Sequence, residues 1–214
     1  MIDGSSSASA SNVHISDSTV RGTLYARGGG SYISGTGIAV VFSESIFTSC
    51  SATGGGGTAA VGGAVYVDGN GVFVTCKDSV INNCSAFDGD GGALWVGVTA
   101  AVELEAVQIN FCTARRGAAC FLASGAWLAT AYVTVAIINC TSNSNSAFHL
   151  EADVANTPLR GLRINAEGQC AAVSASAFFS GTRPSTTLRC ADERFAARDG
   201  SSQTVCGPGA TCSD

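Results

Sequence analysis

The chain of 214 residues has little charge, one lysine and three prolines. Charged residues make up 13% of it, about half of the usual fraction in soluble domains. Low charge together with a positive mean hydropathy argues against a disordered chain, which needs high charge and low hydrophobicity. The formal net charge of −5 argues against the basic footprint of a general nucleic-acid-binding protein. We therefore expect a folded chain with no nucleic-acid partner.

Long apolar runs are also missing, as is a recognisable leader. No run of 18 uninterrupted apolar residues occurs, so the sequence predicts no membrane span. The first seven residues lack the positive charge and apolar core of a secretion signal. The ten cysteines nevertheless favour an oxidising compartment over the cytosol. We expect an extracellular or cell-surface location, with the chain either part of a longer exported protein or freed of its leader.

The chain contains one sequence motif four times. Each copy has a cysteine, several small residues, and then an alanine before an apolar triplet whose central residue carries an aromatic or imidazole ring. The cysteines are separated by 34, 28 and 28 residues. They are Cys50, Cys84, Cys112 and Cys140. A period of this length is typical of units that bury their apolar faces only by stacking on their neighbours.

Strand and turn signals fill each repeat. Short β-branched segments lie at 13–16, 38–42, 72–74, 102–105 and 133–135, and glycine-rich turns separate them at 28–31, 54–57, 68–71 and 88–92. Two or three strands in about 28 residues match one turn of a parallel β-helix. We predict an all-β, single-stranded right-handed parallel β-helix (a solenoid) of about six coils over residues 1–167. An irregular, disulfide-linked cap or tail is expected over residues 168–214.

The repeats resemble those of a known group of proteins. Cys50-Ser51-Ala52 followed by Gly62-Gly63-Ala64, and Cys84-Ser85-Ala86 followed by Gly91-Gly92-Ala93, look like repeats of pectin-lyase-like right-handed β-helix proteins. They are especially similar to repeats of chlamydial polymorphic outer-membrane proteins and related surface adhesins. The resemblance covers about residues 38–150 and implies the fold more strongly than an activity, because this fold serves lyases, hydrolases, adhesins and structural shafts alike. The glycine pair is lost in the third and fourth repeats.

The cysteines divide into two groups. In-register coils would stack the four repeat cysteines into a ladder about 5 Å apart, as buried thiols that act as small apolar groups or as pairs within reach of a disulfide. Their spacing does not match zinc modules, so no metal or cofactor is expected. The disulfide candidates lie in the tail: Cys170, Cys190, Cys206 and Cys212.

One aromatic position recurs in every repeat and is our candidate binding site. Its members are Tyr66, Trp95, Phe121 and His149. Because the flanking residues are all apolar, strand alternation should turn the flanks inward and the rings outward. Three readings remain open: an exposed strip that docks a protein subunit or a sugar ring, rings covered by an insertion loop or the tail, and rings in the core.

Other motifs point more weakly to chemistry. Glu103 and Glu105 share one strand face but are explained as a solvated surface, and residues 88–92 resemble a calcium loop without its bidentate glutamate. Asn83 and Asn139 begin N-linked glycosylation sequons, although an internal asparagine ladder also fits them.

No set of residues in the sequence suggests catalysis. We therefore expect a non-catalytic structural or adhesive element of an extracellular assembly, acting through a rigid binding surface. Its partners would be other protein subunits of a surface or filament assembly, or glycans. The alternative is a carbohydrate-active β-helix enzyme, either a polysaccharide lyase or a glycoside hydrolase.

Overall fold

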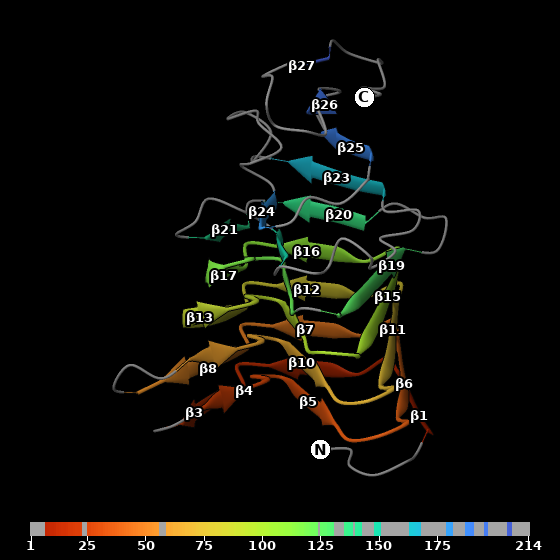
Figure 1. The fold of residues 1–214 in the computed structure, drawn as a ribbon, viewed down its shortest axis with the longest axis vertical. Helices are drawn as coiled ribbons and strands as arrows, with labels where there is room; N and C mark the ends of the chain where they lie inside the picture. Colours follow the sequence, from red (N-terminus) through yellow and green to blue (C-terminus); the bar gives the residue numbers. More distant parts are fainter. Residues whose placement is uncertain are drawn as a thin grey trace.

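The computed structural model describes residues 7–22, 25–55, 59–123, 125–130, 135–138, 140–142, 148–150, 163–167, 179–181, 187–190, 195–196 and 205–206. In this part of the chain every regular element is a β-strand. No helix there is long and apolar enough to cross a membrane. The strands follow one another around a coil, and each pairs with strands one turn away (Figure 1). The all-β solenoid expected from the sequence is confirmed.

Four sheets run along the solenoid, and from β1 to β22 each turn contributes a strand to each of them in a fixed order. The first sheet contains β1 (Ser7–Ser11), β6 (Ala39–Ser43), β11 (Phe73–Lys77), β15 (Ala101–Glu105) and β19 (Trp127–Thr130). The second contains β2 (His14–Ser16), β7 (Ile46–Thr48), β12 (Val80–Asn82), β16 (Gln108–Asn110), β20 (Val135–Ile138), β23 (Arg163–Glu167), β25 (Thr187–Cys190), β26 (Phe195–Ala196) and β27 (Val205–Cys206).

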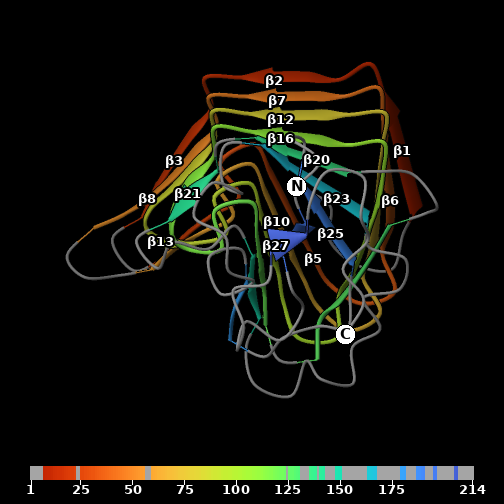
Figure 2. The ribbon, with the colours of Figure 1, turned by 90° about the horizontal axis from the view of Figure 1, so that it is seen from above.

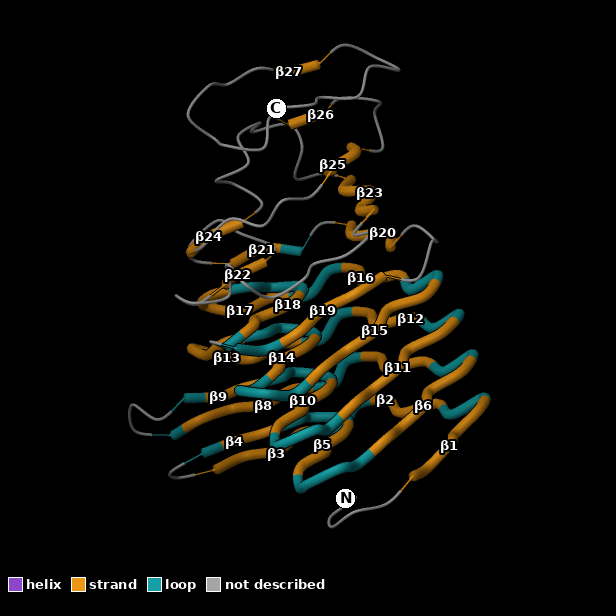
Figure 3. The backbone as a smooth tube through the Cα atoms, turned by 45° about the vertical axis from the view of Figure 1, so that its right-hand side comes forward, coloured by secondary structure: helices purple, strands orange, loops and turns teal. Residues whose placement is uncertain are grey.

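The third and fourth sheets complete each turn. The third contains β3 (Thr19–Gly22), β8 (Ser51–Gly54), β13 (Ser85–Asp90), β17 (Thr113–Arg116) and β21 (Thr141–Ser142), with the short β4 (Ala26–Arg27) and β9 (Ala60–Val61) beside them. The fourth contains β5 (Ser31–Ser34), β10 (Val65–Asp68), β14 (Leu94–Val96), β18 (Cys120–Leu122), β22 (Phe148–Leu150) and β24 (Phe179–Gly181). Figure 3 shows the turns stacked on one another along the axis.

The expected count of about six coils is matched only roughly. In three turns, from β6 to β18, every strand is paired on both sides. The turns outside them are paired or described in part. Strands β23, β24 and β25 continue the second and fourth sheets in parallel, and β26 and β27 add antiparallel pairs. The division expected at residue 167 stays a prediction.

Pairing is in register, so like residues form columns. Val40, Val74 and Val102 occupy one inward position of the first sheet, and Phe47, Ile81 and Ile109 occupy one of the second. All of these side chains are almost fully buried in a single apolar core. Burial alternates along the strands of the first sheet, because successive side chains point to opposite faces.

Single residues with positive φ turn the chain at two corners of each coil. Between the first and second sheets they are Asn12, Glu44, Asp78 and Ala106; between the second and third they are Asp17, Ser49, Asn83 and Phe111. Their φ angles lie between 47° and 55°, in the left-handed region. One such residue between two extended strands redirects the chain, so the coil has sharp corners without longer loops (Figure 2).

The Gly-Gly-Ala motif lies at the corner between the third and fourth sheets. Each of its three residues is required there for a different physical reason. Gly62 has φ +66°, which favours glycine. Gly63 has no room for a side chain, since a Cβ there would lie 2.0 Å from the carbonyl oxygen of Gly92 in the next turn. Ala64 is fully buried and points into the core. In the fourth described turn Ala118 stands where the other turns have the second glycine.

The third sheet carries a lobe beside the main core. The chain runs out along β8 and back along β9, and a small cluster of alanines fills the space between the strands: Ala26, Ala52, Ala60, Ala86 and Ala114. Seen from above, this lobe projects to the left of the coil (Figure 2). Alanine permits the close approach of outgoing and returning strands, so the lobe is thin.

We expect Gly63→Ala to lower the free energy of unfolding by about 3 kcal/mol, because the new methyl group meets backbone atoms of the next turn. Gly71→Ala is the matched control: its Cβ would make only ordinary van der Waals contacts of 3.8 and 3.9 Å with the backbone of Gly37, but its φ of +68° is unfavourable for alanine, at a cost of about 1 kcal/mol. Denaturant unfolding of both variants measures the difference. If both variants lose the same free energy of unfolding, the close contact between turns is not the reason that residue 63 is glycine.

Candidate functional site

The recurring aromatic residues do form one column on the fourth sheet. Tyr66 pairs in register with Trp95, Trp95 with Phe121, and Phe121 with His149. Their described flanks are fully buried in the core, as expected. The structure adds Tyr32, which pairs with Tyr66 in the preceding turn. Sequence reasoning missed Tyr32, although it follows Gly28 at the same distance as Tyr66 follows Gly62.

The rings stack face to face along the solenoid axis. Ring centroids are 5.0 Å apart for Tyr32 and Tyr66, 4.7 Å for Tyr66 and Trp95, and 6.1 Å for Trp95 and Phe121, with planes within 4° of parallel. Stacking occupies both faces of Tyr66 and Trp95. A sugar ring binds an aromatic side chain through its face, so these two rings offer it only their edges.

Arginines from the third sheet lie over this aromatic column. The Cζ atom of Arg27 is 5.3 Å from the centre of the Tyr66 ring, and that of Arg116 is 4.8 Å from the centre of Phe121. Both distances allow a cation–π interaction. Tyr66 and Phe121 are each only 2% exposed. The prediction of an exposed binding strip is therefore wrong for Tyr66 and Phe121. Trp95 is partly exposed, and the side chain of His149 lies outside the described part of the chain.

Tyr66 also takes part in a polar contact at the edge of the column. Its hydroxyl donates a hydrogen bond of 2.9 Å to Oδ2 of Asp68, and the backbone N–H of Gly69 donates to the other carboxylate oxygen. Burial, and then the nearby Asp68, raises the pKa of the Tyr66 hydroxyl. Tyr66 thus stays a neutral donor and holds Asp68 against the sheet.

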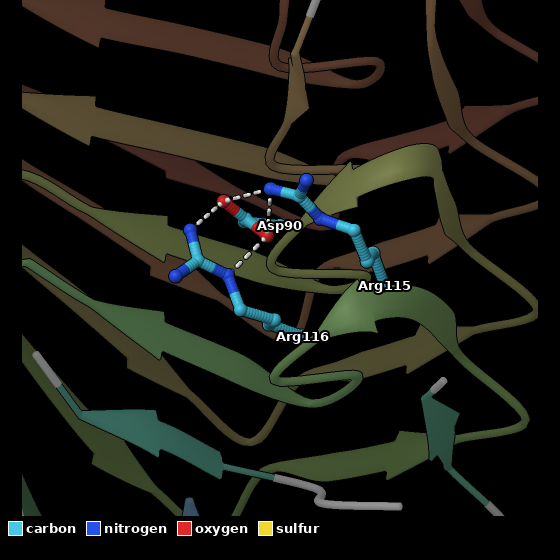
Figure 4. A network of polar contacts seen from close by, with 3 residues as sticks. All are labelled: Asp90, Arg115 and Arg116. Carbon is cyan, nitrogen blue, oxygen red and sulfur yellow. Dashed lines mark hydrogen bonds and ion pairs between the residues drawn. The ribbon is translucent and has the colours of Figure 1, made fainter. Parts of the chain in front are cut away.

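A buried carboxylate anchors both arginines at the end of β17. Asp90 on β13 accepts bonds of 2.9 and 2.6 Å from Nε and Nη2 of Arg116, and longer ones of 3.3 and 3.4 Å from Arg115 (Figure 4). The Asp90 side chain is 7% exposed, whereas that of Arg115 is 50% exposed. The network fixes Arg116 above Phe121 and leaves the Arg115 side chain partly open to solvent.

Four exposed arginine and aromatic side chains lie on strands of the third sheet or, for Tyr25, directly before β4. We call this set the arginine–aromatic face, and it consists of Arg21, Tyr25, Phe87 and Arg115. Tyr25 is 64% and Phe87 62% exposed. Arg21 and Phe87 both pair with Thr53, from either side. Among the side chains that the structure describes, the third sheet carries every arginine, and the one lysine, Lys77, lies on the first sheet.

The four repeat cysteines form the expected buried ladder of thiols, and none of them is in a disulfide. Each follows a strand of the second sheet and is fully buried. The thiol of Cys84 donates to the carbonyls of Asn82, in its own turn, and Phe47, one turn earlier. A hydrogen bond with Cys84, and then burial, raises the pKa of the Cys50 thiol. Of the tail candidates, Cys190 and Cys206 lie in β25 and β27 without described side chains, and Cys170 and Cys212 lie outside the described residues.

The remaining candidates do not assemble with these groups. Glu103 and Glu105 lie on the outer face of β15, and Glu105 forms a 2.9 Å ion pair with Lys77. Within the described ranges no three His, Cys, Asp or Glu side chains are placed to hold a metal ion.

The two sequon asparagines have different outcomes. Asn83 is not internal as the ladder interpretation required: its positive φ turns the exposed side chain outward at a corner. Asn139 lies outside the described residues.

The stacked turns of parallel strands define the class of the molecule as a parallel β-solenoid. Comparisons with protein-family models, with curated proteins and with solved structures each found no match.

We expect Asp90→Asn to lower the free energy of unfolding by about 2 kcal/mol, because both guanidinium groups lose a charged acceptor while remaining partly solvated. Glu105→Gln is the control, since it removes the exposed pair with Lys77 and should cost less than about 1 kcal/mol. Equal losses in denaturant unfolding would show that the Asp90 network contributes no more than a surface pair.

The buried thiol of Cys76 should make stability depend on alkaline pH. Burial raises its pKa from 9.0 to about 12, so between these values the unfolded chain releases a proton that the folded chain keeps. The free energy of unfolding must therefore fall as pH rises through this window. From pH 9 to pH 10 we expect Cys76→Val to lose about 1 kcal/mol less than the parent chain. Identical pH slopes would contradict this assignment.

Proposed function

We propose that this chain is a non-catalytic structural or adhesive β-solenoid element of an extracellular or cell-surface assembly. Its binding surface is the arginine–aromatic face, and its partners present acidic groups, either on neighbouring protein subunits or on glycans. This proposal is supported by the resemblance of the repeats to those of surface adhesins, and by the rigid framework beneath the face.

The observation that carries the proposal is the in-register pairing of Arg21, Thr53 and Phe87 on this face. Between β13 and β17 the register shifts after Ala86, and Arg115 is positioned by its contact with Asp90 instead. Adjacent turns of paired strands are about 4.8 Å apart, so outward side chains at successive turns have fixed spacing. Arg21 and Phe87 lie two turns apart on the same column, with Thr53 between them. Side chains held in this way lose little conformational entropy on binding, which favours recognition by a surface over recognition by a mobile loop.

The charges favour an acidic partner. Arg115 keeps half of its side chain exposed although one nitrogen contacts Asp90. The outer face of the first sheet and its following corner carry four acids, Glu44, Asp78, Glu103 and Glu105, and one cation, Lys77. The third sheet carries four arginines, Arg21, Arg27, Arg115 and Arg116, and two acids, Asp88 and Asp90. The two sides therefore differ in sign, and an acidic partner is attracted to the third sheet and repelled from the first.

The enzyme alternative finds less support. A glycosidase needs two free carboxyl groups across a substrate, one of them able to donate a proton. Asp90 is neutralised by two arginines, Asp68 accepts two hydrogen bonds, and Glu105 is paired with Lys77. These contacts suit fixed structural carboxylates.

The test uses electrophoresis of the whole chain through gels that contain polygalacturonate or dextran. We expect retarded migration only with the acidic polymer, and at least a threefold weaker retardation for Arg115→Ala and Phe87→Ala. Lys77→Ala is the matched control, because it also removes one half-exposed, paired cation but from the first sheet. It should migrate like the parent chain.

Three results would overturn parts of the proposal. Release of reducing ends or unsaturated uronates from either polymer would favour the enzyme alternative. Equal effects of Lys77→Ala and Arg115→Ala would remove the arginine–aromatic face as the binding surface. Antibody labelling of the producing cells only after permeabilisation would contradict the extracellular location.

A further inference from the structure

At the corner between the second and third sheets, equivalent residues of successive turns lie one above another, and two of them, Asn83 and Phe111, form an unusual pair. Successive turns place Ser49, Asn83 and Phe111 at this corner, all with φ of 53°. Serine and asparagine are common in this left-handed region, whereas a bulky aromatic residue there is an outlier. Phe111 is also 52% exposed, so the strain is not explained by burial of its ring.

Asn83 has the position and the sequence of an acceptor for N-linked glycosylation. It is exposed, and the sequon continues with Cys84 and Ser85. Its Nδ2 atom donates one hydrogen bond, of 3.3 Å, to Oγ of Ser49 in the preceding turn. A side-chain amide has two N–H hydrogens, so substitution of one of them leaves this hydrogen bond intact.

We propose that Asn83 carries an N-linked glycan and that its first sugar packs on the exposed ring of Phe111. The two residues occupy the same corner of adjacent turns, about 4.8 Å apart along the axis. Unlike Tyr66 and Trp95, Phe111 is found in no ring stack among the described residues, and its 52% exposure leaves part of the ring accessible to a sugar. The inference rests on the proposed extracellular location, because only exported chains meet the glycan donor.

The transfer itself needs a polyprenyl-pyrophosphate-linked oligosaccharide and its transferase. Nδ2 of Asn83 forms a bond to C1 of the first sugar while the bond from C1 to the pyrophosphate oxygen breaks. The polyprenyl pyrophosphate leaves with that electron pair, and Nδ2 gives up one proton to solvent. No oxidant or reductant takes part.

The acceptor is tested by producing the full chain with a supplied secretion leader in a eukaryotic host and mapping glycopeptides by mass spectrometry. We expect glycan on Asn83, its loss in Ser85→Ala, and equal or higher occupancy in Ser85→Thr. Ser85→Ala removes the sequon while keeping the corner asparagine, so it guards against a folding defect of Asn83→Gln. Asn82→Gln, one residue away and outside any sequon, should keep full occupancy.

Contact with Phe111 is tested by thermal unfolding before and after enzymatic removal of the glycan. The parent chain should lose several degrees of Tm on deglycosylation, and Phe111→Ala should lose much less. A secreted, folded chain with unmodified Asn83 would overturn the acceptor assignment. Equal losses of Tm in both proteins would overturn the packing. Because the leader is supplied, either failure is distinct from intracellular labelling of the native protein, which would contradict the proposed function instead.

Discussion

Parallel hydrogen bonding between successive turns, without a shift of register, is the constraint on which the whole structure depends. Each strand in the three central turns is paired on both sides, so the polar backbone is satisfied along the coil. Among the strands that the structure describes, the register between turns breaks in β13, where Ala86 pairs with Ala114 but Asp90 pairs with Arg116. That break lies in the lobe and does not reach the main core.

The same constraint decides how side chains interact. Because identical positions lie one above another, aromatic residues stack on aromatic residues and thiols on thiols. The aromatic column therefore contributes to the rigidity of the fourth sheet and is not a simple open platform for sugars. Residue types differ most between turns in the lobe of the third sheet and at the corners, where side chains do not have to stack in the core.

Much of this arrangement could be predicted because each repeated residue marks a fixed place in the turn. Cys84 and Cys112 follow strands of the second sheet, and Trp95 lies at the centre of a strand of the fourth, so counting residues sufficed. The arginines over the rings could not be found in this way. Arg27 reaches Tyr66 from a returning strand and Arg116 reaches Phe121 from the end of β17, and the length of chain before each differs between turns.

The outward orientation of the Asn83 side chain could not be predicted from the sequence pattern either. Alternation along a strand predicts which side chains are buried, but a single residue of positive φ between two strands breaks the alternation. Asparagine suits an internal ladder and a left-handed corner equally well, and only the backbone angle distinguishes them. Tyr32 was missed for a simpler reason, since serine replaces the apolar residue before its ring.

The corners with one left-handed residue have a consequence for how such a protein can change over generations. The segment from Ser85 to Cys112 begins and ends at equivalent places, and its 28 residues enter and leave the coil in the same orientation. Copying that block in the gene would lengthen the rod by one turn, with a second Phe87 and Asp90 on the third sheet. Deleting it would remove Phe87 from the arginine–aromatic face and take away the Asp90 carboxylate that holds Arg115 and Arg116. The length of the rod and its recognition surface would therefore change together.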